Sequence, residues 1–63
     1  MKLIESQNIF IVAHKIEAVQ LIPSVEKDVV KVFMGEYGHS FEFDDEDEAV
    51  YFFELILREM KDL

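Results

Sequence analysis

The spacing of apolar residues changes once along this chain. As far as residue 44 they come in short runs with a period near two, which is typical of β-strands. Beyond the acidic run they recur with a period near 3.6, which is typical of a helix that buries one face. These periods predict four strands and one helix, near residues 8–13, 16–22, 28–34, 39–44 and 46–61 respectively.

This order of elements predicts an α+β fold, an antiparallel four-stranded β-meander with one C-terminal α-helix packed on one face. Residues 1–63 are too few for two domains, so we expect a single domain. Residues 1–7 are the candidate for a fifth, edge strand. Pro23 should end the second strand, because proline has no backbone N–H to donate. A break in the alternation near the beginning of that strand predicts a bulge near Glu17. The glycines of GEYG at 35–38 predict a hairpin turn.

The segment NIFIVA, residues 8–13, does not alternate between apolar and polar positions. As a strand it would place Phe10 and Val12 on one face, and apolar side chains on the other face as well. A strand that is apolar on both faces needs cover on both. The sequence therefore predicts that something packs on each side of this strand.

Five consecutive acids, residues 44–48, lie where the strand pattern gives way to the helix pattern. Asp45 is the expected N-cap, with Glu48 as its capping-box partner, and Asp44 with Asp47 is the alternative register. Carboxylates in a first turn also interact favourably with the positive end of the helix dipole. The acidic run therefore has a local structural explanation.

The helix carries more apolar side chains than one buried stripe can hold. The residues expected to face the sheet are Ala49, Phe52, Phe53, Ile56, Met60 and Leu63. Val50 and Leu57 flank that stripe. A single helix also covers only one face of a sheet, so the opposite face would leave a contiguous apolar patch in water.

A second copy of the chain is the simplest cover for this excess, because closed two-fold dimers are the commonest oligomers. We therefore expect a homodimer, formed either by the open sheet faces or by the helices. A monomer that presents the patch to another protein is the alternative. The candidate interface residues are Ile9, Ile11, Val29, Phe33, Val50 and Leu57.

The chain is strongly acidic, with a net charge of −8 from 14 acidic and 6 basic residues. This charge disfavours direct binding to nucleic acid and to anionic membranes, and favours a basic protein partner. An acidic mimic of nucleic acid, which would occupy the groove of a basic DNA- or RNA-binding protein, is the alternative function. Its candidate patch consists of Glu42, Asp44, Asp45, Glu46, Asp47 and Glu48.

No group of residues predicts catalysis. Cysteine is absent, the spacing of His14 and His39 matches no metal motif, and neither a phosphate-binding glycine loop nor a nucleophile elbow is present. We therefore expect no enzyme activity, cofactor or metal site. The apolar runs are too short to span a membrane, and Glu5 to Gln7 interrupt any signal-peptide core, so a cytoplasmic location is expected.

The order NIFIVAHKIEAVQLI, then DVVKVFMGEYGHSFEFDDEDEAVYFFELI, resembles small uncharacterised bacterial and phage proteins built as a β-meander followed by one helix. In outline it is similar to the small flagellar FlbD proteins and to the closing strand-and-helix part of pleckstrin-homology-like domains. The resemblance covers residues 8–57 and rests on the pattern, without an invariant motif. It implies a binding or regulatory protein. The resulting prediction is a small non-enzymatic homodimeric protein-interaction or regulatory module.

Overall fold

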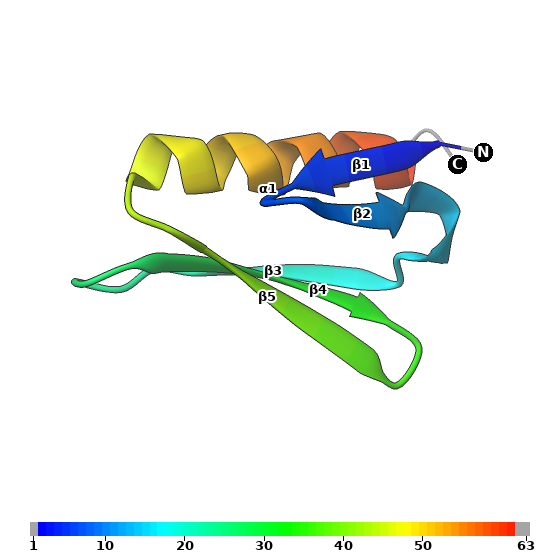
Figure 1. The fold of residues 1–63 in the computed structure, drawn as a ribbon, viewed down its shortest axis with the longest axis horizontal. Helices are drawn as coiled ribbons and strands as arrows, with labels where there is room; N and C mark the ends of the chain where they lie inside the picture. Colours follow the sequence, from blue (N-terminus) through cyan, green and yellow to red (C-terminus); the bar gives the residue numbers. More distant parts are fainter. Residues whose placement is uncertain (1, 62–63) are drawn as a thin grey trace.

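The computed structural model describes residues 2–61, which form an α+β fold of five antiparallel strands and one C-terminal helix (Figure 1). The elements are β1 (Leu3–Ser6), β2 (Ile9–Val12), the 3-10 turn η1 (Ala13–Lys15), β3 (Ala18–Ile22), β4 (Asp28–Met34), β5 (Tyr37–Phe43) and α1 (Glu46–Lys61). The predicted α+β class is confirmed. The predicted single four-stranded meander is wrong, because the strands form two sheets, β1–β2 and β3–β4–β5.

The division into two sheets arises at η1, where the sequence predicted only a short turn. The Ala13 amide donates to the Lys2 carbonyl oxygen at 2.9 Å and extends the β1–β2 pairing by one bond. The 3-10 turn then carries the chain from the hairpin to the start of β3 in the other layer (Figure 1). Ile16, directly after it, is buried in the core, so this connection is anchored.

The hairpin β1–β2 supplies the fifth strand that residues 1–7 suggested, although it pairs with β2 in a sheet of its own. Its two loop residues, Gln7 and Asn8, have φ angles of 54° and 63°. Positive φ at both positions is the conformation of a type I′ turn, whose twist matches that of the flanking strands. The side-chain amide of Gln7 donates to the carbonyl oxygen of Glu42 at 2.6 Å, which fixes the hairpin tip on β5.

The meander β3–β4–β5 is shaped by one glycine and one glutamate. Gly35 opens the two-residue loop between β4 and β5 with a φ of 65°, as in a type II′ turn. Its amide donates to a carboxylate oxygen of Glu17 at 2.7 Å. The Glu17 amide bonds to the carbonyl oxygen of Phe33 at 2.8 Å, although Phe33 is paired with Ala18. Glu17 and Ala18 on one strand therefore lie opposite the single residue Phe33 on the other, which is the arrangement of the predicted bulge.

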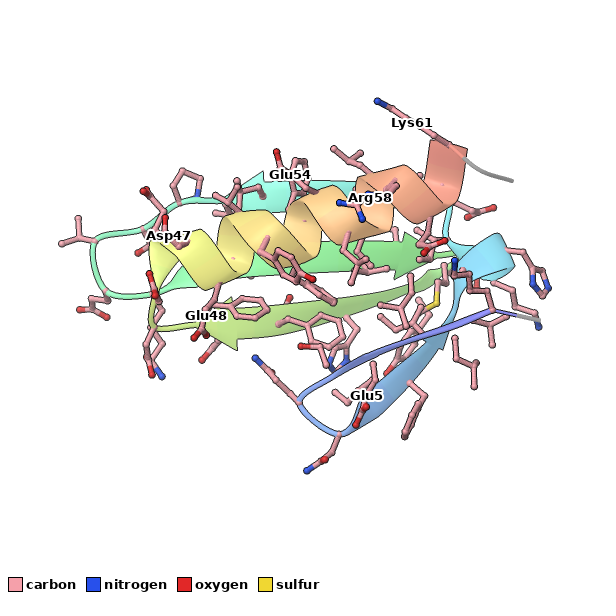
Figure 2. The ribbon with its side chains drawn as sticks, turned by 90° about the horizontal axis from the view of Figure 1, so that it is seen from above. Glu5, Asp47, Glu48, Glu54, Arg58 and Lys61 are labelled. Carbon is pink, nitrogen blue, oxygen red and sulfur yellow. The ribbon has the colours of Figure 1, made fainter. Side chains whose placement is uncertain are left out.

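The helix and the hairpin lie side by side on one face of the three-stranded sheet, as the view from above shows (Figure 2). The core between the layers consists of Ile4, Ile11, Ala13, Ile16, Val30, Val32, Phe41, Phe43, Ala49, Phe52 and Ile56. Phe52 is the central contact of the helix, with its ring centroid 4.9 Å from that of Phe41 and 5.5 Å from that of Phe43. The opposite face of the sheet is covered by none of the elements between residues 2 and 61 (Figure 1).

The helix buries most of the predicted stripe. Ala49, Phe52 and Ile56 are buried, whereas Phe53 and Met60 are half-buried; Leu63 lies outside the described residues.

Glu59 is a buried helix position that the pattern did not predict. It is 7% exposed, and its Oε2 lies 2.9 Å from Nζ of Lys2. A carboxylate in the last turn of a helix meets the negative end of the dipole, so the lysine offsets an unfavourable position. The pair joins the beginning of the hairpin to the end of α1.

Candidate functional site

The acidic run begins the helix as predicted. The Asp47 amide donates to Oδ1 of Asp45 at 3.0 Å. The Ala49 amide donates to the backbone carbonyl oxygen of Asp45 at 3.1 Å. The N-cap assignment of Asp45 is therefore confirmed. The reciprocal capping-box bond from Glu48 is not among the side-chain hydrogen bonds of the described chain, and the Glu48 side chain faces a groove instead.

The six residues of the predicted acidic patch, Glu42, Asp44, Asp45, Glu46, Asp47 and Glu48, are all exposed. They follow the end of β5 into the first turn of α1 and so gather at one end of the molecule. Lys27 reaches two of them, with Nζ 3.9 Å from Glu42 and 3.7 Å from Asp44. Within residues 2–61 these acids and the two histidines form no cluster suited to holding a metal ion.

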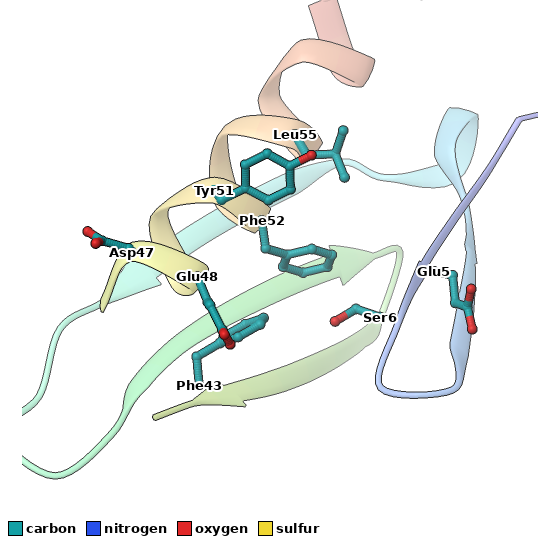
Figure 3. A pocket seen from close by; sticks show the side chains of 8 residues that line it. All are labelled: Glu5, Ser6, Phe43, Asp47, Glu48, Tyr51, Phe52 and Leu55. Carbon is teal, nitrogen blue, oxygen red and sulfur yellow. The ribbon is translucent and has the colours of Figure 1, made fainter. Parts of the chain in front are cut away.

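A groove of about 340 Å³ opens between the hairpin, the end of β5 and the first half of α1 (Figure 3). Its lining residues are Glu5, Ser6, Phe43, Asp47, Glu48, Tyr51, Phe52 and Leu55. Phe43 and Phe52 belong to the core and form an apolar floor, while Tyr51 is 67% exposed. We call this site the acid-rimmed groove, because its three exposed carboxylates are those of Glu5, Asp47 and Glu48.

The hairpin leaves a second apolar surface in water. Glu5, the cross-strand partner of Phe10, lies on the outer face of the hairpin. The apolar residues of this face are Leu3, Phe10 and Val12, since Leu3 is paired with Val12 while Phe10 lies two residues before Val12 on the same strand. Phe10 is 63% exposed and Leu3 is 53% exposed. We call these three residues the outer hairpin face. The inner face of the same strands is closed by Ile4 and Ile11, which belong to the core.

The six predicted interface residues do not form one surface. Ile11 is 2% exposed, so it belongs to the core, and Ile9 packs against that core from the hairpin. Val50 and Leu57 are half-buried on α1.

Val29 and Phe33 are half-buried and lie on the uncovered face of the three-stranded sheet. The ring of Phe33 is already sheltered there. A Cβ atom at Gly38 would lie only 3.4 Å from its Cδ1, and Nζ of Lys31 is 5.3 Å from the ring centroid. An aromatic ring that lies across a glycine covers backbone that would otherwise be exposed. This face therefore depends less on a partner than the outer hairpin face does.

The sequence did not predict either the groove or the outer hairpin face as a site. The only signal for the latter was the doubly apolar segment 8–13. Searches against protein-family models, curated proteins and solved structures each found no match. The resemblance to FlbD and pleckstrin-homology-like proteins therefore stays a prediction. None of the helical residues between 2 and 61 form a segment long and apolar enough to cross a membrane.

Proposed function

We propose that this protein is a small, cytoplasmic, non-enzymatic protein-interaction module that works as a homodimer, in which the outer hairpin faces of two copies pack together. The observation that carries the proposal is the exposure of Phe10 and Leu3, at 63% and 53%, on strands whose other face is already in the core. Strands that are apolar on both faces are typical of sheets covered on both sides.

The energetic argument concerns the exposed side chains. Complete burial of a Phe or Leu side chain contributes about 1.5–3 kcal/mol of free energy. Because Phe10 and Leu3 are about half exposed in one copy, roughly half of that free energy per residue could still be gained by association. A two-fold contact uses the same patch on both copies and therefore covers four such side chains at once. The contact is small compared with the ~1,200–2,000 Å² of stable interfaces, so we expect dissociation on the order of micromolar concentration.

Charge gives the dimer a distinctive salt dependence. Each copy carries a net charge of −8, so two copies repel one another, and salt screens this repulsion. Burial of apolar surface is not weakened by moderate salt. We therefore expect the homodimer to become tighter as the salt concentration rises, which is opposite to the behaviour of a contact made between opposite charges.

Sedimentation equilibrium across a micromolar concentration range tests this proposal. Phe10→Glu should give a monomer, whereas Val25→Glu, the same new charge at a loop residue that is 104% exposed, should sediment as the wild type does. Circular dichroism of both variants should show an unchanged fold. A wild type that is monomeric throughout the range would contradict the proposal, and so would a Phe10→Glu variant that still dimerises while Phe33→Lys does not.

The acidic mimic is a second proposal, supported by the exposure of six acids at one end of the fold. It predicts that the protein displaces DNA or RNA from a basic binding protein in a competition assay. Replacing Asp44, Glu46 and Asp47 together with the corresponding amides should abolish the displacement. Undiminished displacement by the triple variant would refute a role for this patch.

A further inference from the structure

We infer that the acid-rimmed groove is a docking site for a basic segment of a partner protein, which inserts one large apolar side chain between β1 and α1. Glu5 is the one lining residue that the groove shares with the outer hairpin face, because Glu5 is paired with Phe10. The floor and the helical wall lie elsewhere, so this inference does not depend on dimerisation. It assigns the partner by its chemistry: an aromatic or aliphatic anchor flanked by lysine or arginine.

The floor of the groove explains the apolar anchor. Phe43 and Phe52 are 9% and 4% exposed, and their ring centroids are 5.5 Å apart, so the floor is a fixed part of the core. Leu55 packs against the same cluster from the helix. A preformed apolar floor favours an apolar side chain, because its docking needs no rearrangement of the core.

Tyr51 forms the exposed part of the helical wall (Figure 3). Tyr51 is 67% exposed, although it follows directly on residues 48–50 and precedes the buried Phe52 in the helix. Tyrosine combines a large rigid contact area with a polar tip, which explains its enrichment at protein interfaces and among residues that dominate binding energy. An inserted side chain would cover this ring.

The rim explains the basic flanks. Asp47 and Glu48 contribute two carboxylates from the helix, and the Glu5 side chain points away from the floor toward the outer hairpin face (Figure 3). The ion pairs formed within residues 2–61 involve other acids. The rim is therefore negative and leaves its carboxylates available to cations. A second copy of the chain would bring a net charge of −8 to the same rim and is disfavoured there.

The size of the groove also favours a side chain over a cofactor. A volume of about 340 Å³ is at the lower end of the ~300–1,000 Å³ range of small-molecule pockets, and the groove is open to solvent. One anchor with its flanking backbone fits such a site. The arrangement is the usual one for protein contacts, an apolar centre with a polar rim.

A tryptophan peptide tests the inference directly, because the protein contains no tryptophan and the peptide's fluorescence reports on the anchor alone. The probe is the blocked peptide Lys-Lys-Trp-Lys-Lys, titrated with the wild type at about 0.01 M and about 0.15 M salt, where the Debye lengths are ~30 Å and ~8 Å. We expect a blue-shifted emission on binding and weaker binding at the higher salt concentration.

Matched variants separate the anchor from the rim. Tyr51→Ser should weaken binding about tenfold, as expected for a central interface aromatic. The control, Tyr37→Ser, removes a tyrosine that is 63% exposed at the beginning of β5, away from the groove, and should leave peptide binding unchanged. The double variant Asp47→Asn with Glu48→Gln should reduce both the affinity and its salt dependence, whereas Glu54→Gln on the same helix should change neither.

Three results would overturn the inference. The first is the absence of any emission shift up to millimolar peptide. The second is equal effects of Tyr51→Ser and Tyr37→Ser. The third is equal competition by Lys-Lys-Gly-Lys-Lys, which would reduce the site to a nonspecific acidic patch. Repeating the titration with Phe10→Glu distinguishes the two proposals, because groove binding should persist in that variant whether or not the wild type is a dimer.

Discussion

Phe52 and Phe53 are consecutive residues of α1 in different surroundings, and this difference gives a sharp test of the fold. Phe52 is 4% exposed and contacts the rings of Phe41 and Phe43 at centroid distances of 4.9 and 5.5 Å. Phe53 is half-buried at the margin of the same core. Both residues belong to the apolar stripe read from the sequence, so the structure alone decides which of them is central.

The expected magnitudes follow from burial. Phe52→Ala should cost about 3–5 kcal/mol, the usual range for an aromatic removed from a packed core. Phe53→Ala should cost about 1–2 kcal/mol, because only part of its ring leaves water on folding. A chain of 63 residues has roughly 3–9 kcal/mol of stability in total. The first change should therefore remove between a third and all of the stability, and the second should leave a folded protein.

Urea unfolding followed by circular dichroism measures both changes. The protein concentration must be the same in every melt, since dimerisation would add to the apparent stability. We expect Phe53→Ala to retain a cooperative transition with an unchanged slope, and Phe52→Ala to unfold at a much lower urea concentration than Phe53→Ala or to be unfolded without urea. If Phe53→Ala were as damaging as Phe52→Ala, the helix would have to be rotated about its axis relative to the sheet.

Two further predictions concern the ends of the helix and use the same urea melts. Asp45→Ala should cost about 1 kcal/mol through loss of the N-cap, and Asp44→Ala should cost little; equal costs would refute the assigned cap. Lys2→Met should cost about 1–3 kcal/mol because it leaves the buried Glu59 without its cation, while Lys2→Arg should preserve stability. A neutral Lys2→Met would show that the Lys2–Glu59 contact does not hold the hairpin to the helix.

The sequence predicted the elements whose signals are local. The helix was expected near 46–61 and occupies Glu46–Lys61, because the acidic cap and the change of period both lie within a few residues of its beginning. The strand expected at 28–34 also has the observed bounds. Strand ends elsewhere shifted by one or two residues; Ala18 begins β3, for example, because Ala13–Lys15 form a 3-10 turn in front of it.

The two-sheet arrangement could not be read from the sequence, because it depends on which strands pair. The turn at Gln7 and Asn8 lacks the glycine that usually marks a type I′ hairpin, so residues 3–6 gave only a weak strand signal. Glu59 was missed for a similar reason, since a carboxylate is buried only when a distant partner such as Lys2 supplies the charge.

The groove was missed because its lining comes from three separate segments of the chain. Glu5 and Phe43 are 38 positions apart in the sequence, and the hairpin has to fold back over β5 before they share a site. The bond from Gln7 to the Glu42 carbonyl oxygen, which places the hairpin there, has no sequence signature. The outer hairpin face left one local signal, the doubly apolar segment 8–13, but Leu3 joins it only through the pairing of β1 with β2.

Isotope-filtered NMR on an equal mixture of labelled and unlabelled protein is the sharpest test of self-association through the outer hairpin face, because it detects only contacts between copies. We predict intermolecular NOEs from the Phe10 ring to the methyl groups of Leu3 and Val12. They should disappear in Phe10→Glu and persist in Val25→Glu. Intermolecular NOEs that involve only Phe33 and Val29, or none at millimolar concentration, would contradict the assignment of the outer hairpin face as the surface of self-association.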